Sequence, residues 1–168
     1  MKTQQEKMQK YHLINRPNRE IIDNSEITMI LRSGKYATIS MCRRNEPYIV
    51  TLSYGYDYGN NALYFHCSPH GLKLDFIRAN PQVCATVLED GGYVVDECGH
   101  NYRTVVFSGK MEILTDIEDK KHGMKVLLNH LEDKPDIIKE KILKSEEYYS
   151  KMEILRLYIV HINGKAGR

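Results

Sequence analysis

The sequence contains no CxxC pair, because its four cysteines stand apart at Cys42, Cys67, Cys84 and Cys98. That absence excludes a zinc ribbon and a thioredoxin-type motif. Apolar runs are short as well: none approaches the roughly 20 residues that cross a membrane, and residues 1–20 lack the apolar stretch of a secretory signal. We therefore expect a cytoplasmic protein with free thiols and no membrane partner.

An excess of charge of either sign is also missing. The chain has 24 basic and 22 acidic side chains and a net charge of +2. Proteins that bind nucleic acids carry clustered basic surfaces, so we expect no nucleic-acid partner. No Walker A loop, GxGxxG fingerprint or GxSxG elbow occurs either. The 168 residues, 42% of them hydrophobic, are enough for one domain with its own core.

From Tyr36 onward, the sequence is dominated by β-strand patterns. Stretches rich in β-branched and aromatic residues predict six strands, at residues 36–42, 47–56, 62–67, 82–88, 102–114 and 152–162. The polar stretches 43–46 and 57–61 have the composition of tight turns between strands.

Four helices are expected before or between these strands. They cover residues 26–34, 70–80, 116–132 and 136–149. Ser25 and Asp116 are placed to cap the first and the third, and Gly34 to end the first. Because helices and strands do not alternate regularly, the pattern predicts an α+β fold with an antiparallel β-barrel. The barrel domain is expected over residues 21–168, after a polar extension at residues 1–20.

The segment YFHCSPHGLKLD, residues 64–75, is the strongest local candidate for a binding site. A strand ends there and a helix begins, and helix amino termini attract anions through free amides and a partial positive charge. Ser68 adds a hydroxyl, Lys73 adds a charge, and Gly71 lets the backbone approach a ligand closely. The segment is a candidate phosphate cradle; the alternative is an ordinary capped helix with an exposed lysine.

Metal-ligating side chains do not form a convincing set. His66 and His70 stand four residues apart, but a proline and the strand pattern break the helical geometry that this spacing requires. Asp96, Cys98 and His100 fall in a glycine-containing stretch that is better explained as a solvated turn. We therefore expect no metal site.

Seven segments, in family order, resemble the nitroimidazole-resistance (Nim) branch of the pyridoxamine-phosphate-oxidase-like split-barrel superfamily: RPNRE, EITMILRSG, EPYIVTLSYGYD, ALYFHCSPHGLK, NPQV, YRTVVFSGK and HINGK. The resemblance covers about residues 16–165, and its most specific part is the run 47–83. It implies a six-stranded antiparallel split β-barrel with flanking helices. It also implies a homodimer with FMN in a groove at the subunit interface.

The resemblance further implies which residues hold the FMN. One strand would run along the isoalloxazine ring by backbone contacts, the cradle would hold the ribityl phosphate, and a third segment would reach across from the second subunit. The residues concerned are Thr38, Val50, Thr51, Leu52 and Ser53 at the ring, His66, Ser68 and Lys73 at the phosphate, and Arg103 and Thr104 from the second subunit.

Two departures from the family argue against vitamin B6 oxidation. Leu72 stands where pyridoxamine-phosphate oxidases have an arginine just before the phosphate lysine. The terminal HINGKAGR does not match their arginine-bearing substrate segment. Within the Nim branch, Thr51 stands where many chains have proline.

The expected function is that of an FMN-dependent oxidoreductase that reduces nitroaromatic compounds, with the cofactor carrying the electrons. His66 is the candidate catalytic proton donor, because imidazole transfers protons near neutral pH. The alternative is a non-enzymatic flavin or haem binder for storage, sensing or delivery, since superfamily members also bind haem or a deazaflavin. The expected partners are a second copy of the chain and a small-molecule substrate or electron donor.

Overall fold

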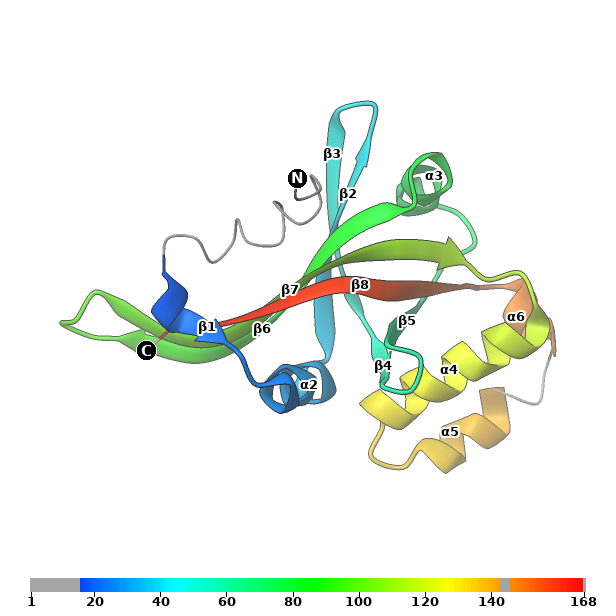
Figure 1. Ribbon diagram of the computed structural model, residues 1–168. Coiled ribbons are helices and arrows are strands. Elements are labelled where there is room, and N and C mark those ends of the chain that lie inside the picture. Colours follow the sequence, from blue (N-terminus) through cyan, green and yellow to red (C-terminus); the bar gives the residue numbers. More distant parts are fainter. Residues whose placement is uncertain (1–15, 143–145, 168) are drawn as a thin grey trace.

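The computed structural model describes residues 16–142 and 146–167, and Figure 1 shows their arrangement. The polar extension expected at residues 1–20 therefore lies mostly outside the described residues. Its last part forms a one-turn 3-10 helix, η1 (Pro17–Arg19), and a short strand, β1 (Glu20–Ile21), which pairs with the last strand of the chain.

The strands form one antiparallel sheet. Those that follow β1 are β2 (Tyr36–Arg43), β3 (Glu46–Ser53), β4 (Gly55–Asp57), β5 (Ala62–Cys67), β6 (Gln82–Val94), β7 (Gly99–Ile113) and β8 (Glu153–Gly167). Their hydrogen-bonded order is β3-β2-β6-β7-β8-β5-β4, and β1 pairs with β8. This confirms an α+β fold built on a large antiparallel sheet. Within the described ranges no ladder joins β3 to β4, so closure of the barrel stays a prediction.

The α-helices of the described chain are α2 (Asn24–Ser33), α3 (Leu72–Ala79), α4 (Ile117–Leu131), α5 (Pro135–Ile142) and α6 (Glu146–Ser150). None of these helices has the length and apolar character that crossing a bilayer requires. The single helix predicted over residues 136–149 is thus two helices, α5 and α6, and residues 143–145 between them lie outside the described residues.

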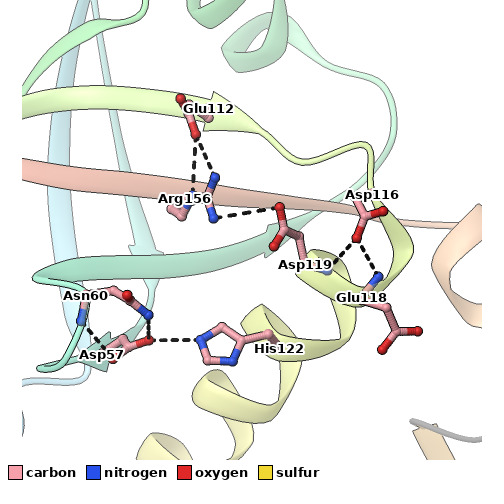
Figure 2. A network of polar contacts seen from close by, with 8 residues as sticks. All are labelled: Asp57, Asn60, Glu112, Asp116, Glu118, Asp119, His122 and Arg156. Atoms are coloured by element: carbon pink, nitrogen blue, oxygen red, sulfur yellow. Dashed lines mark hydrogen bonds and ion pairs between the residues drawn. The ribbon is translucent and has the colours of Figure 1, made fainter.

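One of the two predicted helix caps is confirmed and the other is wrong by two residues. Asp116 caps α4, because its carboxylate accepts hydrogen bonds from the Glu118 and Asp119 amides at 2.9 and 3.0 Å (Figure 2). Helix α2 is capped by Asp23 rather than by Ser25. The Asp23 carboxylate accepts from both the amide and the hydroxyl of Ser25, at 2.8 Å each, so the serine is a donor to the cap.

The strand predicted over residues 47–56 is two strands, because the chain bends at Tyr54. The Tyr54 side chain is fully buried, and its hydroxyl donates to the Leu31 carbonyl oxygen in α2 at 2.7 Å. Gly55 then lies so close to α4 that a Cβ atom there would be 2.7 Å from Leu127 Cα. The bend is therefore fixed by two helices, and β4 runs beside α4.

The main core lies on one face of the sheet. Strands from both halves of the hydrogen-bonded order contribute to it, so the sheet curls around the core. Its most deeply buried members include Ile30, Leu31, Ala37, Ile39, Leu63, Phe65, Leu74, Val105, Phe107, Leu155 and Leu157. A second, smaller cluster packs α4 against β5 and β8. Side chains on the other face of β2 and β3 are mostly exposed or half-buried.

The hairpin of β6 and β7 is longer than predicted and extends away from α4 and α5 in Figure 1, where it is green. Near its tip, Asp90 accepts from the Gly92 amide at 2.8 Å and lies 2.7 Å from His100 Nε2. Asp96 and Cys98 occupy the turn with positive φ angles of 65° and 50°. The described residues contain no group of three or more histidine, cysteine or acidic side chains placed to hold a metal ion.

Candidate functional site

A row of threonine hydroxyls crosses the face of the sheet opposite the main core. Backbone register places Thr38 of β2 between Thr51 of β3 and Thr86 of β6. The Oγ1 atoms of Thr38 and Thr51 are 2.9 Å apart, and those of Thr86 and Thr104, on β7, are also 2.9 Å apart. The fold thus brings three predicted site residues, Thr38, Thr51 and Thr104, into one line across four strands. We call Thr38, Thr51, Thr86 and Thr104 the threonine row.

Strand β3, which holds the predicted ring contacts, is an edge strand. In the described chain it pairs only with β2, so the backbone N–H and C=O groups along its other side have no strand partner. Val50 and Leu52 pack their side chains against the core, whereas Thr51 and Ser53 lie on the opposite face. The groups of this segment that a ligand can reach are therefore the backbone edge and the two hydroxyls.

The predicted phosphate cradle is the connection from β5 to α3. His66 is exposed, while the residues on either side of it in β5 are buried. The hydroxyl of Ser68 accepts a long hydrogen bond of 3.4 Å from the His70 amide. Gly71 precedes α3 with a φ angle of 142°, in the region that favours glycine. The loop therefore leads directly from an exposed histidine to the start of a helix.

The first turn of α3 has the features of an anion site. Its N-cap is Gly71, and within the described part of the chain no side chain caps the free amides of this turn. Lys73 is half-buried, and its ammonium group makes no hydrogen bond or ion pair with any residue that the structure describes. Burial raises the pKa of the Cys67 thiol, and the positive charge of Lys73 opposes that shift. The first turn of α3, close to the end of β5, therefore carries an ammonium group that has no carboxylate partner among the described residues.

Arg103 and Thr104 already have partners within their own chain. Arg103 Nε lies 2.7 Å from Glu89 Oε2, and its Nη1 lies 3.5 Å from Glu26 Oε1. A cavity of about 410 Å³ lies beside these ion pairs. The buried Thr104 hydroxyl donates to the Val87 carbonyl oxygen at 3.0 Å. A contact from Arg103 to a second subunit's cofactor would therefore compete with two carboxylates.

The structure thus sorts the predicted residues into two groups. One is the threonine row together with the β3 edge, and the other is the cradle with His66, Ser68 and Lys73. No hydrogen bond or ion pair between described residues connects the two groups. That both contact one cofactor stays a prediction.

Two features near Thr104 and Arg103 were not predicted from the sequence. Thr86, which links Thr38 to Thr104, alternates with apolar residues in the strand pattern, and this alternation was the only available signal. Its alignment with the other threonines depends on the pairing of three strands. The carboxylates that bind Arg103 come from α2 and β6, and nothing local marks them as its partners.

The solved structures that share this fold include the following three. A candidate 5-nitroimidazole antibiotic resistance protein from Bacteroides thetaiotaomicron VPI-5482 aligns with a TM-score of 0.75 and 22% identity, over 88% of this chain and 86% of that one. An FAD-binding protein from Mesorhizobium loti aligns with a TM-score of 0.66 and 23% identity, over 89% and 96% of the two chains. An FAD and haem binding protein from Mycobacterium smegmatis has a TM-score of 0.75 and 17% identity, over 89% and 74%.

Family membership follows from the sequence match rather than from these distant structures. The family model described as pyridoxamine 5'-phosphate oxidase matches residues 23–166. That range contains both groups of candidate site residues and runs from the cap of α2 into β8. The chain therefore belongs to the pyridoxamine 5'-phosphate oxidase family.

Proposed function

We propose that two copies of the chain bind FMN between them, and that the protein is an oxidoreductase that reduces nitroaromatic compounds. The observation that carries this proposal is the free edge of β3. The pyrimidine end of an isoalloxazine ring carries N–H donors and C=O acceptors. The β3 edge presents the same two kinds of group in a row from Val50 to Ser53. The ring can therefore pair with backbone atoms alone.

The cradle supports a mononucleotide, because its groups fit one phosphate. The first turn of α3 offers free amides, Lys73 offers a charge without an ion-pair partner in the described chain, and Ser68 offers a hydroxyl. Charge-assisted contacts of this kind are the strong hydrogen bonds of phosphate sites. We assign the ribityl phosphate of FMN to this loop.

The face that carries the threonine row supports a homodimer. Tyr36, Ile49 and Leu88 lie on this face with 63, 65 and 61% of their surfaces exposed. Large apolar side chains gathered on one exposed face are typical of an interaction surface. A second copy related by a twofold axis would cover the same face of both chains, and it would form two equivalent cofactor sites.

The proposed reaction rests on the relation to the Bacteroides structure, whose name refers to 5-nitroimidazole resistance. Bound flavin supplies the electron-transfer chemistry that side chains lack. The backbone amides of β3 would stabilise negative charge on a flavin ring bound along this strand. His66 would hold and transfer a proton near neutral pH, and its exposed position at the end of β5 leaves it accessible to a substrate.

A flavin or haem binder without catalytic activity is the second candidate function. The observation that favours it is that the His66 side chain makes no hydrogen bond or ion pair with any residue of the described chain. A catalytic histidine is usually oriented by a partner. The FAD and haem binding protein from Mycobacterium smegmatis has the same fold.

Anaerobic kinetics with His66→Ala would separate the two functions. If His66 donates a proton, the variant should lower kcat for a nitroimidazole by about 100-fold while FMN occupancy stays unchanged. His70→Ala is the matched control, because this exposed histidine lies in the same loop. Loss of flavin from His66→Ala would instead make His66 a cofactor contact.

The parent protein provides the decisive comparison. An oxidoreductase should have its flavin reduced by NADH, NADPH or another cellular donor and reoxidised by the nitroimidazole. A flavin that resists every donor, yet is reduced by light, would contradict the enzymatic proposal and favour the binder.

A further inference from the structure

A second cleft lies between α4 and the segment that joins β4 to β5. Its volume is about 430 Å³, and Tyr56, Tyr58, His122, Lys125 and Asn129 are among the residues that line it. None of the residues assigned to the flavin lines this cleft. It is therefore separate from both groups of the candidate flavin site.

One wall of the cleft is a polar stripe of α4. His122, Lys125 and Asn129 are spaced three and four residues apart, so they share one face of the helix. All three side chains are exposed. The side chains of Lys125 and Asn129 make no hydrogen bond or ion pair with the residues that the structure describes. The stripe therefore offers an ammonium group and an amide that are both available to a ligand.

Asp57 fixes the position of His122 at one end of this stripe. Its Oδ2 atom lies 2.8 Å from His122 Nε2 and also accepts from Asn60 Nδ2 at 2.8 Å, as Figure 2 shows. Burial opposes charge on Asp57, but the hydrogen bonds from Asn60 and His122 outweigh it and hold the pKa of this carboxyl below its ordinary range. The Asp57 carboxylate is therefore already hydrogen-bonded to two side chains. The other ring nitrogen of His122, Nδ1, is directed away from Asp57.

The opposite wall is aromatic. The rings of Tyr56 and Tyr58 lie edge to face, with centroids 6.4 Å apart. Tyr58 is largely exposed, and the Arg32 guanidinium carbon lies 5.2 Å from the centre of its ring. This wall can pack against a flat apolar ring, and it adds a second permanent cation beside the cleft.

We propose that this cleft binds a small aromatic carboxylate. The ring of the ligand would lie against Tyr56 and Tyr58, and its carboxylate would meet Lys125 and the free edge of His122. The ligand needs both its ring and its carboxylate to fill the cleft. A neutral aromatic compound lacks the charge-assisted contacts, and an inorganic anion lacks the ring. The site does not depend on the proposed flavin function.

Benzoate is the probe that tests this site, used with the full chain and observed by NMR. Benzoate should shift the ring C–H signals of His122, and benzyl alcohol, its neutral analogue, should bind about tenfold more weakly. Lys125→Met should raise the Kd for benzoate by about tenfold. Tyr58→Leu should weaken benzoate binding as well.

Lys121→Met is the matched control, because Lys121 is on the same helix but pairs with Glu118 at 2.7 Å and does not line the cleft. It should leave the Kd unchanged. Equal binding of benzoate and benzyl alcohol, an unchanged Kd in Lys125→Met, or unmoved His122 signals would each overturn the proposal. Flavin absorbance of the same samples separates the two proposals. A protein that binds benzoate in this cleft but takes up no FMN would support the cleft and contradict only the flavin proposal.

Discussion

Among single residues, Lys73 is the side chain on which the proposed phosphate contact depends most. Lys73→Ala should weaken FMN binding by about 1.5–3 kcal/mol, or about 10- to 150-fold, because a charge-assisted contact is lost. Titration of the flavin-free protein with FMN, followed by flavin fluorescence, measures this change. Lys151→Ala is the control, because Lys151 follows α6 and pairs with Glu147. Unchanged affinity in a folded Lys73→Ala variant would remove this lysine from the site.

Asp57 leads to a prediction about pH. Its folded-state pKa lies below the ordinary value of about 3.9, so its charged form adds stability that is present above that value and lost as the pH falls through the folded-state pKa. Asp57→Asn should therefore lower the free energy of unfolding by about 1 kcal/mol at neutral pH. The difference from the parent should disappear in strong acid.

Urea denaturation at a series of pH values checks this prediction. Asp136→Asn is a suitable control, since Asp136 is almost fully exposed and its ion pair with Lys139 should add little. A destabilisation by Asp57→Asn that stays constant into strong acid would show that the carboxylate charge is not its cause.

At the scale of elements, the bend between β3 and β4 shows where local patterns stop being informative. The residues around Tyr54 continue the aromatic and β-branched pattern, so the sequence predicted one strand. The bend depends on the buried hydrogen bond to Leu31 in α2 and on the contact of Gly55 with α4, and both helices are distant in sequence. The edge position of β3 and the alignment of the threonine row depend on long-range strand pairing in the same way.

Several features that depend on near neighbours were predicted correctly, although the cap of α2 is Asp23 rather than Ser25. The turn between β2 and β3 falls where residues 43–46 indicated it, and Asp116 caps α4 through amides two and three residues away. The predicted phosphate cradle also rests on near neighbours, because its strand end, glycine and lysine are contiguous, and its binding of phosphate stays a prediction. Its free helix amides became evident only when Gly71, rather than a capping side chain, was found at the N-cap.

The contact of Gly55 with α4 can be tested directly. Gly55→Ala should destabilise the fold by about 1–3 kcal/mol, because the added methyl group would meet the Leu127 backbone at 2.7 Å. Gly59→Ala is the matched control, since its new methyl group would meet only Asp57 Oδ1, at 3.5 Å. Urea denaturation of both variants measures the difference. Equal stability of the two would show that β4 and α4 are not packed as closely as described.

At the scale of the whole molecule, the two groups of site residues are separate in one chain, and the resemblance to the family assigns them to one cofactor in a dimer. No local pattern in a single sequence predicts a contact between two copies. The exposed apolar residues beside the threonine row are the observation that favours the proposed contact.

Ile49 provides the test of assembly. If the proposed dimer forms, Ile49→Asp should convert it to a monomer and lower FMN occupancy, because the change places a charge in the proposed interface. Ile137→Asp is the same change at an equally exposed isoleucine on α5, and it should leave the dimer intact. Light scattering coupled to size-exclusion chromatography measures both. A parent protein that is monomeric and still holds its full complement of FMN would contradict the dimer.

The absorbance spectrum of the purified protein, with the released cofactor identified by chromatography, tests FMN binding most directly. The β3 edge and the cradle predict a flavin spectrum and one FMN for each chain. A protein that carries a Soret band without flavin, or that stays colourless and takes up no FMN when the cofactor is supplied in excess, would contradict it.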